Sequence, residues 1–121
     1  MLIESGKATA VQYMSNTMPV PSDKLDIAIC TAMAGEMLGL KLIYLEAGSG
    51  AQHSIPISMI EQVKQNVSIP IITGGGLRTP EKASQAAVAG ADIVVIGNAF
   101  ENNSGLISEM ADAVHKASNN I

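Results

Sequence analysis

The sequence predicts an α/β fold of four βα units and favours their arrangement as the C-terminal half of a (β/α)8 barrel. Short apolar, β-branched segments alternate with helical patterns along the chain, and the last two segments each end in a glycine-containing turn. Such alternation is typical of a parallel sheet, and paired phosphate-binding turns follow the last two strands of many (β/α)8 barrels. Residues 1–121 are expected to form one half-barrel domain with phosphate-binding loops. An open four-stranded sheet is the alternative, because a complete barrel needs about 200–250 residues or more.

The first predicted unit joins a strand to an unusually apolar helix. The strand is expected at Ala8–Met14, and the helix at Asp23–Leu38, with Ser22 as its N-cap and Gly39 as its stop. The centre of this helix is apolar almost all round, which is typical of a helix buried on more than one side. Three sulfur-containing side chains of the helix are therefore expected in the core: Cys30, Met33 and Met37.

The three later units repeat the pattern more regularly. Apolar, β-branched runs predict strands over Leu42–Glu46, Ile69–Thr73 and Asp92–Ile96. Amphipathic or alanine-rich runs predict helices over Ser58–Asn66, Pro80–Ala89 and Gly105–Ser118. Thr79 before Pro80 has the residue types of an N-cap and a first helical residue.

The composition argues against several classes of function. The net charge is −4, aromatic residues make up 2% of the chain, and no run of Lys or Arg occurs. These features argue against binding to nucleic acid. A single cysteine excludes an internal disulfide and suits a reducing cytosol, so a cytoplasmic location is expected. No apolar stretch reaches the ~20 residues that span a bilayer.

Two glycine-containing turns predict an anion site. Gly74, Gly75 and Gly76 follow one apolar strand directly, and Gly97 and Asn98 follow the next. Glycine lets an anion approach the backbone N–H groups closely, and a helix N-terminus favours negative charge. A single glycine is more often an ordinary turn residue. Three glycines in a row, matched one unit later, favour phosphate binding.

Glu46 is the predicted acidic group beside this anion site. A carboxylate repels phosphate, so Glu46 is expected to accept hydrogen bonds from ligand hydroxyls or to act as a general base. The alternative is a strand-end carboxylate that caps the next turn or pairs with a lysine. Tyr44 should point to the same side of the strand. Ser49 and Arg78 are either ligand donors or ordinary surface residues. Together these groups suggest a small polyol phosphate as the ligand.

Four stretches resemble the C-terminal half of the geranylgeranylglyceryl phosphate synthase family: Tyr44–Ala51, Gly74–Arg78, Ala89–Asp92 and Gly97–Asn98. The sequence after Glu46 resembles the geranylgeranyl type rather than the related heptaprenyl type. The resemblance implies transfer of an isoprenoid from its diphosphate to the 3-hydroxyl of sn-glycerol 1-phosphate, a step of phospholipid biosynthesis that uses Mg²⁺. It implies Glu46 as the catalytic residue. The substrate-binding residues that it implies are Tyr44, Leu45, Glu46, Ala47, Gly48, Ser49, Gly50, Gly74, Gly75, Gly97 and Asn98.

The chain also departs from this family. The family's Mg²⁺-binding aspartate lies near the start of the full protein and has no counterpart here, so no metal ligand is assigned. Transferase activity is therefore expected only with a partner that supplies the missing N-terminal half-barrel, or through self-association, and a homo-oligomer is expected from the family. Two alternatives stay open: a sugar-phosphate isomerase or lyase, and a non-catalytic phosphate-binding or assembly module.

Overall fold

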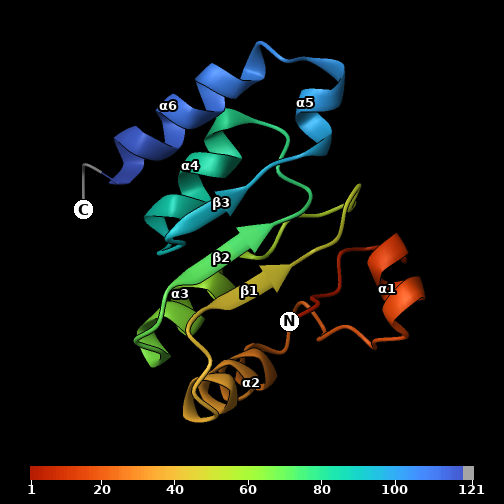
Figure 1. Ribbon diagram of the computed structural model, residues 1–121, viewed down its shortest axis with the longest axis vertical. Coiled ribbons are helices and arrows are strands. Elements are labelled where there is room, and N and C mark those ends of the chain that lie inside the picture. Colours follow the sequence, from red (N-terminus) through yellow and green to blue (C-terminus); the bar gives the residue numbers. More distant parts are fainter. Residues whose placement is uncertain (119–121) are drawn as a thin grey trace.

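The computed structural model describes residues 1–118 and shows a parallel sheet with helices between its strands (Figure 1). The strands β1, β2 and β3 are hydrogen-bonded in that order. The expected α/β class and partial barrel are confirmed. The elements are α1 (Ala10–Ser15), α2 (Leu25–Met37), β1 (Ile43–Glu46), α3 (Ile57–Asn66), β2 (Ile71–Gly74), α4 (Pro80–Val88), β3 (Ile93–Val95), α5 (Asn98–Asn102) and α6 (Leu106–Ser118).

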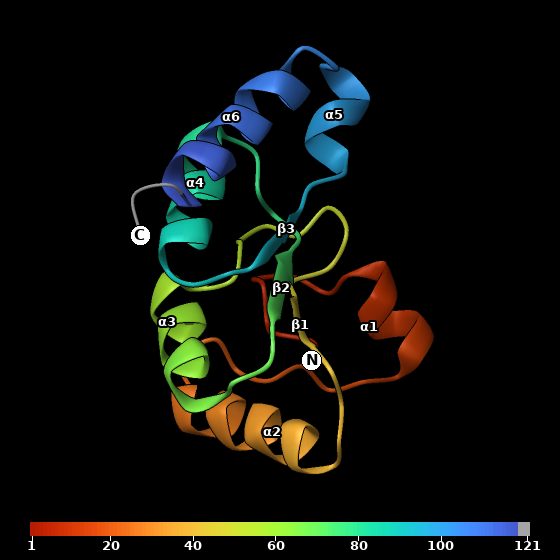
Figure 2. The same ribbon diagram turned by 60° about the vertical axis from the view of Figure 1, so that its left-hand side comes forward.

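The longer helices cover only one face of the sheet. Figure 2 shows α2, α3, α4 and α6 following one another along one side of the strands. Ile43, Leu45 and Ile71 point to this side and are at most 4% exposed. On the other face, Ile93 is 47% and Val95 is 42% exposed. A parallel sheet normally has both faces covered, so the uncovered face is the side that would form the interior of a complete barrel.

The predicted strand at Ala8–Met14 is wrong. Residues Ala10–Ser15 form α1 instead, and Met1–Ile3 takes the strand position beside β1. The Ile3 N–H donates to the Glu46 carbonyl at 2.9 Å, and the Glu46 N–H donates to the Met1 carbonyl at 2.9 Å. Because strand propensity is expressed only where a partner strand exists, the apolar N-terminus forms these bonds and the later segment is left to coil into a helix.

The expected burial of Cys30, Met33 and Met37 is also wrong. Cys30 is exposed, Met33 is 39% exposed and Met37 is 86% exposed. The side of α2 that packs inward carries small residues, since its fully buried members are Ala28 and Ala32 together with Gly35. Ile27, Met33 and Met37 of α2 therefore remain exposed within residues 1–118.

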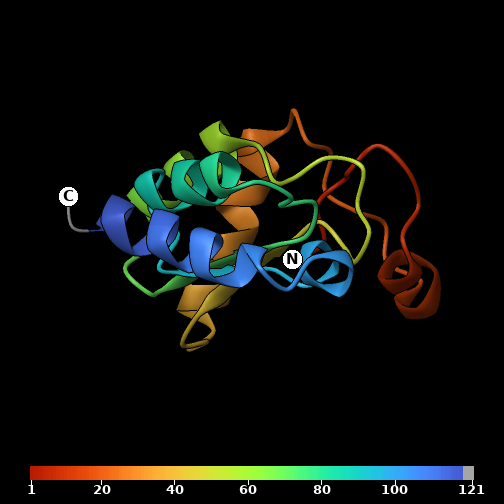
Figure 3. The same ribbon diagram turned by 90° about the horizontal axis from the view of Figure 1, so that it is seen from above.

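Of the three residues predicted to begin or end a helix, Gly39 and Thr79 do so and Ser22 does not. The Ser22 hydroxyl donates to Glu4 and accepts from no helix N–H, and α2 begins after Lys24, so the Ser22 cap is wrong. Gly39 adopts φ 87° and its N–H donates to the Glu36 carbonyl, as a stop residue does. The Thr79 hydroxyl accepts from the Lys82 N–H at 3.4 Å, which confirms that cap. Beyond it, α4 packs against α6, and Figure 3 shows the two side by side.

The Asp92 carboxylate links β2 to β3 at the amino ends of the strands, which is the end of the sheet opposite the glycine turns. Asp92 accepts from the Ile71 N–H at 2.8 Å and pairs with Lys64 at 2.8 Å. Partial burial raises the pKa of Asp92, but the hydrogen bonds from Lys64 and Ile71 outweigh it and hold the pKa below its usual value. This contribution to stability is therefore present above the usual pKa and is lost as the pH falls through the lowered one.

Replacing Asp92 with alanine should lower the free energy of unfolding by about 1–3 kcal/mol, because the buried N–H of Ile71 loses its acceptor. Chemical denaturation at neutral pH measures the change. The matched control is Asp112→Ala, which removes an exposed carboxylate from α6. Equal stability of the two variants would contradict the role given to Asp92.

Candidate functional site

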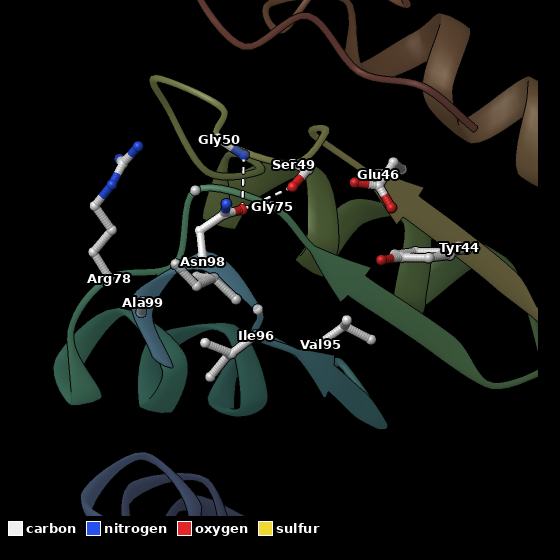
Figure 4. Close-up of a pocket in the computed structure, with 13 residues that line it drawn as sticks. Tyr44, Glu46, Ser49, Gly50, Gly75, Arg78, Val95, Ile96, Asn98 and Ala99 are labelled. Atoms are coloured by element: carbon white, nitrogen blue, oxygen red, sulfur yellow. Dashed lines mark hydrogen bonds between the residues drawn. The ribbon is translucent and has the colours of Figure 1, made fainter. Parts of the chain in front are cut away.

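An open pocket lies at the carboxyl ends of the strands (Figure 4). Its volume of about 180 Å³ is smaller than the ~300–1,000 Å³ typical of pockets for drug-sized ligands. The pocket therefore has the size for a small metabolite. It is lined by Tyr44, Glu46, Ser49, Gly50, Gly75, Gly76, Leu77, Arg78, Val95, Ile96, Gly97, Asn98 and Ala99.

Seven of the residues predicted for the site line this pocket: Tyr44, Glu46, Ser49, Gly50, Gly75, Gly97 and Asn98. Four others lie outside its lining: Leu45, Ala47, Gly48 and Gly74. Leu45 and Ala47 are at most 1% exposed and belong to the core, because neighbouring residues of a strand point to opposite faces. Gly48 and Gly74 lie behind the lining and shape it, as described below.

Gly76, predicted as part of the anion turn, also lines the pocket, and so does Arg78, for which a ligand-donor role is one of two predicted alternatives. Four further lining residues were not predicted: Leu77, Val95, Ile96 and Ala99. Val95 is the last residue of β3 and Ile96 follows it, and no local sequence pattern marks these two apolar side chains as pocket lining. Leu77 and Ala99 carry no chemical signal in the sequence.

The three-glycine corner packs directly on the loop that follows β1. A Cβ on Gly75 would lie 2.7 Å from the Gly48 carbonyl oxygen, and one on Gly76 would lie 2.7 Å from the His53 carbonyl oxygen. Both glycines also have positive φ, 88° and 71°. Only glycine combines this backbone conformation with such close contact. The corner therefore requires glycine in order to pack on this loop, and both glycines line the pocket.

A second contact joins the loop after β1 to the turn after β3. The Asn98 Oδ1 accepts from the Ser49 hydroxyl at 2.8 Å and from the Gly50 N–H at 2.9 Å. Figure 4 shows both bonds as dashed lines across the pocket rim. The two glycine-containing turns and the loop thus form one continuous wall, although the partners lie far apart in the sequence.

Glu46 combines a structural contact with access to the pocket. Its Oε1 accepts from the Gly48 N–H at 2.7 Å, so it caps the next turn. Glu46 also lines the pocket, and an ionised carboxylate has further lone pairs with which to accept hydrogen bonds from a ligand. The cap fixes the carboxylate without using its full acceptor capacity.

Tyr44 lies beside Glu46 on the open face of β1 (Figure 4). Burial raises the pKa of the Tyr44 phenol, and the neighbouring Glu46 carboxylate raises it further. The phenol is therefore protonated at neutral pH and is a hydrogen-bond donor. Its hydroxyl lies over Gly74, where an added Cβ would come within 2.5 Å of the oxygen.

Replacing Gly74 with alanine should lower the free energy of unfolding by about 1–3 kcal/mol, because the new Cβ collides with the Tyr44 hydroxyl. The cost should fall in a Tyr44→Phe background, where that oxygen is gone and the nearest remaining atom is the Val95 Cβ at 3.1 Å. Denaturant unfolding of the two single variants and the double variant measures the coupling. An equal cost of Gly74→Ala in both backgrounds would show that the hydroxyl does not occupy this space.

The described residues do not form a metal site of their own. Among residues 1–118, no three His, Cys, Asp or Glu side chains gather closely enough to hold an ion. Glu46 is the one carboxylate that lines the pocket within this part of the chain. The described helices also include none with the length and apolarity needed to cross a bilayer.

Comparison with known proteins identifies a matching family and several similar sequences. A model of the PcrB family matches residues 1–118. The chain is 60% identical, over 117 residues, to the geranylgeranylglyceryl phosphate synthase of Chitinophaga pinensis, covering 97% of this chain and 46% of that protein. It is 38% identical to the synthase of Korarchaeum cryptofilum, covering 93% of this chain and 46% of that protein. The chain thus spans slightly less than half the length of these curated relatives.

Solved structures agree with the sequence comparison. The (S)-3-O-geranylgeranylglyceryl phosphate synthase of Thermoplasma acidophilum, in complex with its substrate sn-glycerol-1-phosphate, superimposes with a TM-score of 0.85 at 32% identity. The match covers 98% of this chain and 47% of that one. The wild-type synthase of Thermoplasma volcanium gives a TM-score of 0.83, also at 32% identity, and covers 99% of this chain and 47% of its own.

Proposed function

This chain belongs to the PcrB family, and we propose that it is the acceptor-binding half of a geranylgeranylglyceryl phosphate synthase. In this proposal its pocket binds sn-glycerol 1-phosphate, whose 3-hydroxyl receives a geranylgeranyl-type group from the isoprenoid diphosphate. The observation that carries the proposal is the division of the pocket into a glycine-lined end and an end with Glu46 and Tyr44. The Thermoplasma acidophilum relative, crystallised with this substrate, supports it.

The chemistry of the two ends suits the two ends of glycerol phosphate. Gly75, Gly76 and Asn98 line one end of the pocket, and backbone amides of such glycine turns suit a phosphate dianion. Glu46 would repel the phosphate and attract hydroxyl donors. The ligand therefore binds with its phosphate toward the glycines and its alcohol groups toward Glu46.

The reaction forms one carbon–oxygen bond and breaks another. The 3-hydroxyl oxygen attacks the first carbon of the allylic diphosphate, the bond from that carbon to diphosphate breaks, and diphosphate leaves with the electron pair. Glu46 takes the hydroxyl proton as general base. Its turn cap from Gly48 keeps the carboxylate in place during the step, and positioning of the hydroxyl supplies much of the rate.

In this proposal, residues outside this chain bind the Mg²⁺ ion. The acidic groups of residues 1–118 do not gather into a site for the ion, and the pocket itself offers a single carboxylate. We therefore assign no step to a metal held by this chain. The ligands for Mg²⁺ belong to the N-terminal half-barrel, together with the binding surface for the diphosphate.

The uncovered face of the sheet supports the need for a second half-barrel. Ile93 and Val95 stand exposed on the side that would be the barrel interior, and β3 is an edge strand. Exposed apolar faces and free strand edges favour association. The partner is an N-terminal half-barrel or a second copy of this chain, and the assembly is a homo-oligomer of such units in a cytoplasmic enzyme of phospholipid metabolism.

A second candidate function is a non-catalytic phosphate-binding module. It is favoured by the same two findings, an incomplete sheet and the lack of a metal site among the described residues. A sugar-phosphate isomerase or lyase would need a second acid or base in the pocket. The described lining supplies one carboxylate and no histidine, which disfavours that reading.

Complementation tests the proposed function. The chain is mixed with the N-terminal half of the Chitinophaga pinensis relative, and ether product is measured from geranylgeranyl diphosphate, sn-glycerol 1-phosphate and Mg²⁺. We expect product from the mixture and none from either half alone, with the full-length relative as positive control. An inactive mixture that still binds glycerol phosphate would favour the non-catalytic module. A mixture that neither reacts nor binds it would overturn both functions.

A further inference from the structure

Arg78 donates two hydrogen bonds to the loop that follows β1. Its Nη2 donates to the Ala51 carbonyl at 2.6 Å, and its Nη1 donates to the Gln52 carbonyl at 3.3 Å. Figure 4 shows the side chain extending from the glycine corner toward the part of the loop that carries Gly50. A guanidinium presents several N–H groups in a rigid fork, so it can bridge two consecutive carbonyl groups.

The loop that Arg78 contacts forms one wall of the pocket. Ser49 and Gly50 line the pocket from this loop. Both ends of the loop are anchored in the core, since Ala47 and Ala51 are at most 1% exposed. Gly50 between them faces open space, because an added Cβ would have no atom within 4 Å. Hydrogen bonds from Gly50 to Asn98, and from Arg78 to the Ala51 carbonyl, therefore help to fix the part of the loop that lines the pocket.

We propose that Arg78 is a positioning residue, which holds the loop at residues 47–52 in its ligand-binding shape rather than contacting the phosphate. The inference rests on the proposed binding of glycerol phosphate. Two of the guanidinium N–H groups already point at loop carbonyls, which turns the group toward the loop. Arg78 lies in the chain between the glycine corner and α4. Its side chain therefore connects this corner to the pocket wall formed by Ser49 and Gly50.

The test compares Arg78→Lys and Arg78→Gln with Lys82→Gln. Lys82 is an exposed cation of α4, so its replacement removes the same charge nearby and leaves the loop carbonyls untouched. Amide hydrogen exchange of residues 49–53 is measured without ligand. The dissociation constant for sn-glycerol 1-phosphate is then measured at low and high salt.

Both Arg78 variants should speed loop exchange and weaken glycerol phosphate binding, each about tenfold, as expected for losing a charge-assisted hydrogen bond. Lysine should not rescue, because it cannot bridge two carbonyl groups. The salt dependence of binding should change no more than it does in Lys82→Gln.

Three results would overturn the inference. Wild-type affinity in Arg78→Lys, together with loss in Arg78→Gln, would show that the charge binds phosphate directly. A larger change in salt dependence than in the Lys82 variant would show the same. Unchanged loop exchange in both variants would show that Arg78 does not hold the loop. If the wild-type chain binds no glycerol phosphate, the proposed function fails, and the exchange measurement still decides the contact between Arg78 and the loop.

Discussion

Replacing Gly75 with alanine is expected to abolish measurable glycerol phosphate binding and to destabilise the chain by about 2–5 kcal/mol. The added Cβ would lie 2.7 Å from the Gly48 carbonyl oxygen and 2.8 Å from the Gly48 nitrogen, both backbone atoms that cannot move aside easily. Strain at φ 88° adds about 1–2 kcal/mol, and the overpacking adds about 1–3 kcal/mol. The displaced loop carries the turn that orients Glu46, so both ends of the pocket are disturbed.

Thermal unfolding and calorimetric titration with sn-glycerol 1-phosphate measure these two effects. Gly39→Ala is the matched control, because Gly39 has nearly the same φ, 87°, and no atom within 4 Å of an added Cβ. It should lose about 1–2 kcal/mol from strain alone and keep its affinity. If Gly75→Ala behaves like Gly39→Ala, then the contact between the glycine corner and Gly48 is not what shapes the pocket.

Replacing Glu46 with glutamine should weaken sn-glycerol 1-phosphate binding about 10–100-fold, because hydrogen bonds from the ligand hydroxyls lose a charged acceptor. The amide oxygen of glutamine can still accept from the Gly48 N–H, so the turn should remain. Inorganic phosphate, which has no alcohol end, should bind equally well or better, because a repelling charge is gone.

Comparing the two ligands by calorimetric titration separates these contributions. Glu46→Ala is the companion variant, since it removes the turn cap as well and should also lower the stability by about 1 kcal/mol. An unchanged affinity of Glu46→Gln for glycerol phosphate would remove Glu46 from the binding site. An equal loss for both ligands would show that the carboxylate serves the phosphate corner instead.

The features that sequence could predict are those set by neighbouring residues. Three glycines after an apolar strand, and Thr79 before Pro80, depend on local backbone chemistry, and both occur where expected. The alternation of side chains along β1 is equally local. That rule puts Tyr44 and Glu46 on one face, and it would have excluded Leu45, which entered the predicted site through resemblance alone.

The features that sequence could not predict depend on distant partners. Ala8–Met14 has the residue types of a strand, but the place beside β1 is occupied by the N-terminus, a choice that local propensity cannot reveal. The Ser49–Asn98 bond joins residues 49 positions apart, and the contacts of Arg78 cross 26 and 27 positions. No local pattern specifies such pairs.

The exposed methionines of α2 show a third reason why burial could not be predicted from the sequence. An almost uniformly apolar helix predicts burial on several sides, yet Met37 is 86% exposed. The prediction assumed that the covering surface lies within the same chain. The open face of the sheet has the same explanation: Val95 is 42% exposed on it, so its covering surface also lies outside residues 1–118.

Nuclear magnetic resonance titration of the chain with sn-glycerol 1-phosphate, compared with inorganic phosphate and with glycerol, measures directly whether one pocket binds both the phosphate and the alcohol groups. Both phosphate-containing ligands should shift the amide signals of Gly75, Gly76 and Asn98. Only sn-glycerol 1-phosphate should also shift Tyr44 and Glu46, and glycerol alone should shift little. Identical shifts from phosphate and sn-glycerol 1-phosphate, or shifts confined to residues outside the pocket, would contradict a site that reads both the phosphate and the alcohol.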